Sequence, residues 1–308
     1  MNAWRVRLAP ALMVAKPQAA QDMNYNEIIL QGDARIADMN IASPGAGGFH
    51  LWWLGQHSFI AKHSSAVIYI DAFLTPMEGR QCPPLLTPAQ CANASIFCGT
   101  HDHADHIDHP AWPGMAKASP NAKFVVPQLL LDRGLGGALG IPAARFVGLD
   151  DGQRVEIAGV KITGIGAAHE LLDRDPVGGK YPYLGLVFEY GGVTLYHAGD
   201  TVWYEGLQTK LRRWNKFDVM MVPINGRDAT RLRENIIGNM TYQEAADLCG
   251  PLEPGLVIPT HYDMFAMNPG DPEAFIDYMS VKYPKVKTRR CRYGERVGPG
   301  AKGQGPRD

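Results

Sequence analysis

The feature that most constrains this chain is a cluster of four potential metal ligands within six residues, His101-x-His103-x-Asp105-His106. The cluster follows, after Gly99 and Thr100, a short apolar run, residues 95–98, which predicts a buried strand. Open α/β sheets place their chemistry just beyond the carboxyl ends of strands. Imidazoles and carboxylates suit divalent metals, but six residues cannot surround one ion alone. A loop here could direct two side chains at one metal and two at a second metal about 3.5 to 4 Å away.

Three further residues that could bind metal each follow another predicted strand. His169 comes after residues 161–165, Asp200 after residues 193–197, and His261 after residues 256–259. A single histidine after a strand is commonly an ordinary polar residue. The combination with the His101 to His106 cluster indicates one shared site built from several strand ends.

The apolar pattern predicts an α/β fold in which strands dominate and helices cover them. The predicted strands are residues 49–54, 58–61, 67–70, 95–98, 123–126, 155–157, 161–165, 184–190, 193–197, 219–223 and 256–259. A capping box, Thr241 to Glu244, begins one helix, and Asp271-Pro272 begins another. The Gly-rich residues 43–48 predict a connector, so we expect an N-terminal arm (1–48), one domain (49–297) and a disordered tail (298–308).

Composition limits the partners. With 30 Lys and Arg against 31 Asp and Glu, the net charge of −1 gives no field that would attract nucleic acid, so we expect a small-molecule substrate. Five cysteines without C-x-x-C spacing favour a reducing, cytoplasmic location. A weak signal peptide within residues 1–21 is the alternative. No segment approaches the roughly 18 apolar residues that a membrane span needs, and a homo-oligomer is compatible with the sequence.

The ordered set of ligand types resembles the pattern of the metallo-β-lactamase superfamily over residues 49–265. The resemblance implies a four-layer αββα sandwich and two divalent metals, Zn²⁺ or Mn²⁺, with Fe²⁺ also accepted. It implies that the first metal binds His101, His103 and His169. It implies that the second binds Asp105, His106 and His261, with Asp200 bridging the two.

Within that superfamily, four segments look most similar to the L-ascorbate-6-phosphate lactonase group: residues 52–55, 100–108, 195–200 and 257–261. The resemblance implies a hydrolase in which a hydroxide bridging the metals attacks a lactone or related ester of a sugar acid, phosphorylated or not. Asp105 would orient the hydroxide and carry its proton to the leaving oxygen.

Residues that could bind the substrate or orient the metal ligands are suggested by their positions after predicted strands. Asn225 and Arg227, after residues 219–223, are candidates to bind the substrate, and Arg231 and Arg233 nearby could join Arg227 in binding a phosphate. Asp71 and Asp102 are candidates to orient the imidazoles that bind metal.

Three other functions remain open. A metal-dependent phosphodiesterase or nuclease would use the same ligands, although the neutral charge and the short spacing between Asp200 and His261 disfavour a polyanionic substrate. A redox di-iron protein would more commonly replace one motif histidine with a carboxylate. A metal-binding scaffold protein would tolerate losses among the seven positions, and none is lost here.

Overall fold

The computed structural model describes residues 26–45 and 47–298 as one α/β unit built on two sheets. The seven-stranded sheet has the order β13-β1-β2-β3-β4-β5-β6. Its strands are β1 (His50–Trp53), β2 (Phe59–Lys62), β3 (Val67–Ile70), β4 (Ile96–Cys98), β5 (Lys123–Pro127), β6 (Phe146–Leu149) and β13 (Arg296–Val297). The segment considered for a signal peptide, and all of the predicted tail after residue 298, lie outside the described residues.

The second sheet has six strands in the order β12-β11-β10-β9-β8-β7. They are β7 (Arg154–Ile157), β8 (Val160–Gly166), β9 (Leu184–Tyr190), β10 (Val193–His197), β11 (Val219–Pro223) and β12 (Val257–Thr260). β3 to β6 are parallel in the first sheet, and β10 to β12 are parallel in the second. The carboxyl ends within each parallel set therefore share one edge.

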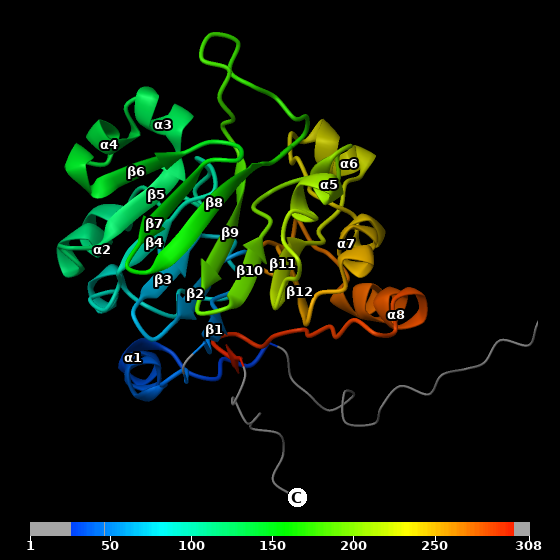
Figure 1. The fold of residues 1–308 in the computed structure, drawn as a ribbon, viewed down its shortest axis with the longest axis horizontal. Coiled ribbons are helices and arrows are strands. Elements are labelled where there is room, and N and C mark those ends of the chain that lie inside the picture. The colour runs from blue at the N-terminus through cyan, green and yellow to red at the C-terminus, as the bar shows by residue number, and fades with distance from the viewer. Residues whose placement is uncertain (1–25, 46, 299–308) are drawn as a thin grey trace, which may run out of the picture.

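Helices lie outside both sheets, which gives the expected αββα layers (Figure 1). On the first sheet they are α2 (Trp112–Ala118), α3 (Gln128–Asp132) and α4 (Leu135–Ala138). On the second they are α5 (Leu207–Leu211), α6 (Ala229–Arg233), α7 (Tyr242–Cys249) and α8 (Pro272–Lys282). The apolar faces of the two sheets meet in the core, where the rings of Phe59 from β2 and His197 from β10 lie 6.1 Å apart. Among the described helices, none is long and apolar enough to cross a membrane.

The structure confirms the predicted strands and both predicted helices. Thr241 caps α7 with the reciprocal capping-box bonds to Glu244, and the Asp271 side chain caps α8. Beyond the predicted elements, the structure adds the strands β6 and β13 and the helices α1 (Gly32–Ile41) and α2 to α6. Arg35 and Met39 of α1 are buried.

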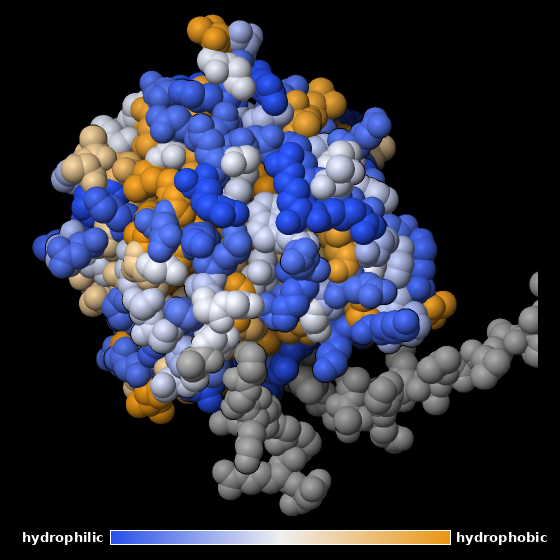
Figure 2. All heavy atoms as spheres, in the orientation of Figure 1, coloured by the Kyte–Doolittle hydropathy of each residue, from blue (hydrophilic) through white to orange (hydrophobic). Residues whose placement is uncertain are grey.

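The longest projection from the fold joins β8 to β9 and stands clear of the body at the top of Figure 1. A tight turn from Asp175 to Lys180 forms its end, and Val177 within that turn is 95% exposed. The face shown in Figure 2 is largely hydrophilic, with an apolar spot at the end of this projection.

Candidate metal centre

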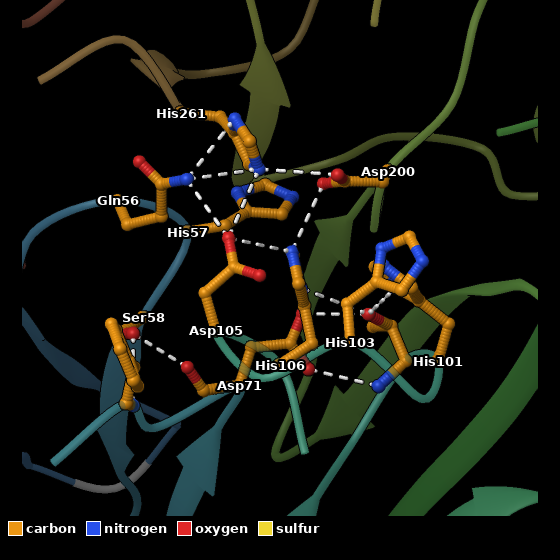
Figure 3. A network of polar contacts seen from close by, with 12 residues as sticks. Gln56, His57, Ser58, Asp71, His101, His103, Asp105, His106, Asp200 and His261 are labelled. Carbon is orange, nitrogen blue, oxygen red and sulfur yellow. Dashed lines mark hydrogen bonds and ion pairs between the residues drawn. The ribbon is translucent and has the colours of Figure 1, made fainter. Parts of the chain in front are cut away.

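The seven predicted ligands converge on one place between the sheets. His101, His103, Asp105 and His106 occupy the loop after β4 of the first sheet. The second sheet supplies His169 beyond β8, Asp200 beyond β10 and His261 directly after β12. Because both sheets direct strand ends to the same edge, Asp105 and His261, which are 156 positions apart in the sequence, become neighbours (Figure 3).

The ligand atoms form three overlapping groups, each with its atoms within 4.8 Å of one another. One group is His101, His103 and His169; another is Asp105, His106 and His261. The third joins His101 and His106 to Asp200. The first two groups match the two ligand sets that the sequence resemblance implied.

Asp200 lies between those sets. Its Oδ1 is 3.3 Å from His106 Nε2, and its Oδ2 is 3.1 Å from His261 Nε2 and 3.6 Å from His169 Nε2. A carboxylate that reaches histidines of both sets is in the position of a bridging ligand.

The donor set fits divalent metals. His106 Nε2 and Asp200 Oδ1 are buried and have no hydrogen-bond partner, although leaving a buried polar atom unpaired is costly. Imidazole nitrogens and carboxylate oxygens without thiolates suit Zn²⁺, Mn²⁺ or Fe²⁺. A cation at this point would satisfy both atoms at once.

Asp71, which directly follows β3, orients one of these histidines. Its Oδ2 lies 2.6 Å from His106 Nδ1, and its carboxylate also accepts hydrogen bonds from the Thr100 backbone N–H and hydroxyl. A carboxylate on Nδ1 keeps the proton there and leaves Nε2 free to face Asp105 and Asp200. This contact agrees with the prediction that Asp71 orients an imidazole of the site.

Asp102 does not share that role. Its Oδ1 lies 2.6 Å from Nε2 of the exposed His109 and not against any of the seven predicted ligands. Asp102 and His109 form an exposed ion pair at the surface, so Asp102 does not orient any of the predicted ligands.

The two histidine sets differ in their protonation before metal binds. Burial lowers the pKa of His169 to about 4, so this imidazole is neutral at pH 7. Burial also disfavours charge on His261, but Asp200 and Asp105 outweigh it and raise the pKa of His261 to about 9. Burial likewise disfavours the charged form of Asp200, yet His261 and His106 hold its pKa well below the usual range.

Gln56, which the sequence interpretation missed, also belongs to the site. Its side-chain amide donates to Asp105 Oδ2 at 2.9 Å and lies 3.1 Å from His261 Nε2. Gln56, Asp71 and His261 all have positive φ, an uncommon backbone state for such residues that often marks functional sites. Gly55 before Gln56 signals a turn, but only the paired sheets show that this turn faces the metal ligands.

A cavity of about 270 Å³ opens onto the ligands. Its lining residues are Gln56, His103, Asp105, His169, Asp200, Asn235, Ile236, Ile237, His261, Phe265, Met267 and Asn268. The predicted substrate contacts Asn225 and Arg227 are not among them. The guanidinium of Arg227 instead donates to the Asn239 carbonyl and to Glu244, and the Asn225 amide donates to Asn268. Position after β11 placed these residues near the site, but the Arg227 guanidinium and the Asn225 Nδ2 group are bound by other parts of the protein.

Comparison with known proteins agrees with this geometry. Residues 67–262, more than half of the chain, match the beta-lactamase superfamily domain. The chain belongs to the beta-lactamase superfamily. A UPF0173 metal-dependent hydrolase of Thermococcus onnurineus is 28% identical over 227 residues, which cover 72% of this chain and 88% of the relative.

Solved structures show that the same superfamily fold extends over most of the chain. Igni18, described as a novel metallo hydrolase from Ignicoccus hospitalis, covers 82% of this chain and 98% of its own, with a TM-score of 0.61 and 21% identity. CmlA, a diiron β-hydroxylase from Streptomyces venezuelae, covers 83% of this chain and 54% of its own, with a TM-score of 0.62 and 14% identity. At these identities the likeness concerns the fold alone, so the site must indicate the reaction.

Proposed function

We propose that this member of the beta-lactamase superfamily is a metal-dependent hydrolase that uses two divalent cations to cleave a lactone or related ester. The observation that carries the proposal is the convergence of two ligand sets on a shared carboxylate, Asp200. His101, His103 and His169 would hold the first cation. Asp105, His106 and His261 would hold the second, with Asp200 common to both.

When bound, the cations would supply a water of lowered pKa and polarise the carbonyl that is attacked. Asp105 lines the cavity and is the residue that can take the water's proton and pass it to the leaving oxygen. The hydrogen bond from Gln56 fixes the orientation of the Asp105 carboxylate. Asp71 keeps His106 Nε2 pointing into the site.

The resemblance to the L-ascorbate-6-phosphate lactonase group supports a lactone of a sugar acid as the first substrate class to test. A phosphodiester is the alternative within the same ligand chemistry. The 270 Å³ cavity favours a small molecule over a polymer.

Metal content tests the bridging role of Asp200. After loading with Zn²⁺ or Mn²⁺ and desalting, the unmodified protein should retain two metals per chain by elemental analysis, and Asp200→Ala should retain fewer. Asp102→Ala is the matched control, because this aspartate lies in the same loop but pairs with His109. Retention of two metals by Asp200→Ala would refute the shared-ligand assignment.

Turnover tests the reaction class. We would measure hydrolysis of simple lactones, sugar lactones, phosphorylated sugar lactones and bis-p-nitrophenyl phosphate by the metal-free, Zn²⁺-loaded and Mn²⁺-loaded protein. Lactone hydrolysis that requires metal and falls at least 100-fold in Asp105→Asn would support the proposal. Preference for the phosphodiester would favour the alternative, and metal binding without any turnover would favour a scaffold protein.

A further inference from the structure

The cavity above the ligands divides into a polar floor and an apolar wall. The floor carries the metal-ligand side chains and Gln56. The apolar wall consists of Ile236, Ile237, Phe265 and Met267, from the loop after α6 and the loop after β12. Met267 is 62% exposed. Apolar side chains gathered beside a reactive centre commonly bind the unreactive part of a ligand.

The wall is anchored as part of the fold. Phe265 forms a backbone bridge with Arg80, and its ring lies 6.4 Å from the ring of Phe73. The Ile236 backbone N–H donates to the Arg231 carbonyl at 2.8 Å. A ligand would therefore meet a preformed surface and would not have to order it.

Among the described residues that line this cavity, none is a lysine or an arginine. The arginines nearest in sequence, Arg227, Arg231 and Arg233, each pair with an acidic side chain outside the cavity lining. Arg231 donates to Asp228 and to the Asn225 carbonyl, and Arg227 pairs with Glu244. A phosphate here would lack the charge-assisted hydrogen bonds that such a group normally requires.

One polar group on the wall side is oriented to donate a hydrogen bond. Asn268 Oδ1 accepts from Asn225 Nδ2 at 3.0 Å and from Arg231 Nη1 at 2.7 Å. Because both donors fix the oxygen end of the amide, Nδ2 is the end that can donate to a ligand in the cavity. Asn225 and Arg231 thus position Asn268, which can bind an uncharged oxygen acceptor.

We propose that the substrate carries an uncharged, apolar group, such as an alkyl chain, which packs on the apolar wall beside an oxygen acceptor bound by Asn268. This inference rests on the proposed ester or lactone hydrolysis and narrows its substrate class. It places a neutral alkyl lactone or ester ahead of a phosphorylated sugar lactone.

The first test is a homologous series of alkyl lactones whose side chains grow from one to seven carbons, assayed with the Zn²⁺-loaded protein. We expect kcat/KM to rise about three- to fourfold for each methylene that becomes buried. A phosphorylated sugar lactone should be a poorer substrate than the longer alkyl lactones. A flat response to chain length, or a preference for the phosphorylated compound, would overturn the inference while leaving the hydrolase proposal intact.

Met267→Gln tests the wall itself, because it replaces an exposed apolar side chain with a polar one of similar size. We expect kcat/KM for the seven-carbon lactone to fall about three- to tenfold while the one-carbon lactone is unaffected. Val281→Thr is the matched control, since Val281 is an exposed apolar residue on α8, outside the cavity lining. An equal effect of Met267→Gln on both substrates would contradict the assignment.

Calorimetric binding separates this inference from the proposed reaction. Octanoate should bind the Zn²⁺-loaded protein more tightly than butanoate, and Met267→Gln should reduce that ratio while Val281→Thr preserves it. If no lactone is hydrolysed but the octanoate preference is present, the reaction is wrong and the apolar subsite stands. If octanoate and butanoate bind equally, the subsite is wrong whatever the enzyme hydrolyses.

Discussion

At the residue scale, Asp71 orients His106, one of the proposed metal ligands, without belonging to the proposed ligand set itself. Its carboxylate accepts hydrogen bonds from Thr100 and lies against His106 Nδ1. The direction in which His106 Nε2 points therefore depends on Asp71. The left-handed backbone of Asp71 turns the chain at the end of β3. Such a conformation costs about 1 to 3 kcal/mol and persists where surrounding structure enforces it.

Asp71→Asn should therefore weaken metal binding without removing a proposed ligand. The amide can present a donor to His106 Nδ1, which favours the tautomer with its proton on Nε2 and opposes coordination. We expect Zn²⁺ affinity to fall about 10- to 100-fold, measured by competition with a chromophoric chelator. Asp102→Asn should leave the affinity unchanged, and an unaltered affinity in Asp71→Asn would show that Asp71 does not orient the ligand.

The protonation of His261 gives a pH-dependent prediction. With its pKa raised to about 9 in the metal-free protein, this imidazole is charged at pH 7, whereas metal requires its neutral form. Zn²⁺ binding at pH 7 should therefore release protons, and affinity should increase as pH rises towards 9. Calorimetry in buffers of different ionisation enthalpy counts the released protons. Metal binding without proton release at pH 7 would contradict the charged state of His261.

At the element scale, the turn after β10 determines where Asp200 lies. Gly199 has φ +61°, and a Cβ at this position would come within 2.4 Å of the Leu184 carbonyl oxygen in β9. The turn thus needs both a left-handed backbone and close approach to the neighbouring strand, which only glycine allows.

Gly199→Ala should lower the free energy of unfolding by about 2 to 4 kcal/mol, because backbone strain and a steric clash add. Gly152→Ala is the control: Gly152 also has positive φ, but its added Cβ would meet nothing within 4 Å. That variant should lose only about 1 kcal/mol. Denaturant unfolding of the metal-free proteins measures the free energy of unfolding of both variants. Equal losses would show that the close approach to the Leu184 carbonyl adds no cost beyond the backbone strain.

The elements differ in how well the sequence predicts them. β11 is buried at every position and β9 at all but Glu189, so their apolar residues identify both strands directly. In contrast, β13 has two residues and exists because it pairs with Leu51 and Trp52 far away in the sequence. The strand β6 is a short, partly exposed edge strand that contains Gly148, so its local pattern is weak.

The same distinction explains the site. The seven proposed metal ligands are histidines and aspartates that follow strands, and their order along the chain is enough to predict them as a set. Gln56, Asn268 and the apolar wall have no such signal, because ordinary side chains become part of the cavity only when separate loops meet. Arg227 illustrates the converse: a guanidinium near a strand end suggested an anion site, but Glu244 of α7 binds it.

At the scale of the whole molecule, the site joins the two halves of the sandwich. His101, His103, Asp105 and His106 lie in a loop that follows a strand of the first sheet, whereas His169, Asp200 and His261 follow strands of the second. Each proposed metal would bind ligands from both sheets. Metal binding should therefore stabilise the packing of one sheet against the other and not only the loops that carry the ligands.

Removal of metal should consequently lower the melting temperature of the entire domain in one cooperative transition. A metal site adds about 2.7 kcal/mol to the free energy of unfolding when free metal is present at about 100 times its Kd. Loss of metal from two such sites should lower Tm by roughly 5 to 15 °C. Differential scanning calorimetry of Zn²⁺-loaded and chelated protein measures the change. In Asp200→Ala, which lacks the ligand shared by both sets, the difference should largely disappear. A chelation effect of the same size in that variant, or a separate low-temperature transition for one sheet, would show that metal does not tie the two halves together through Asp200.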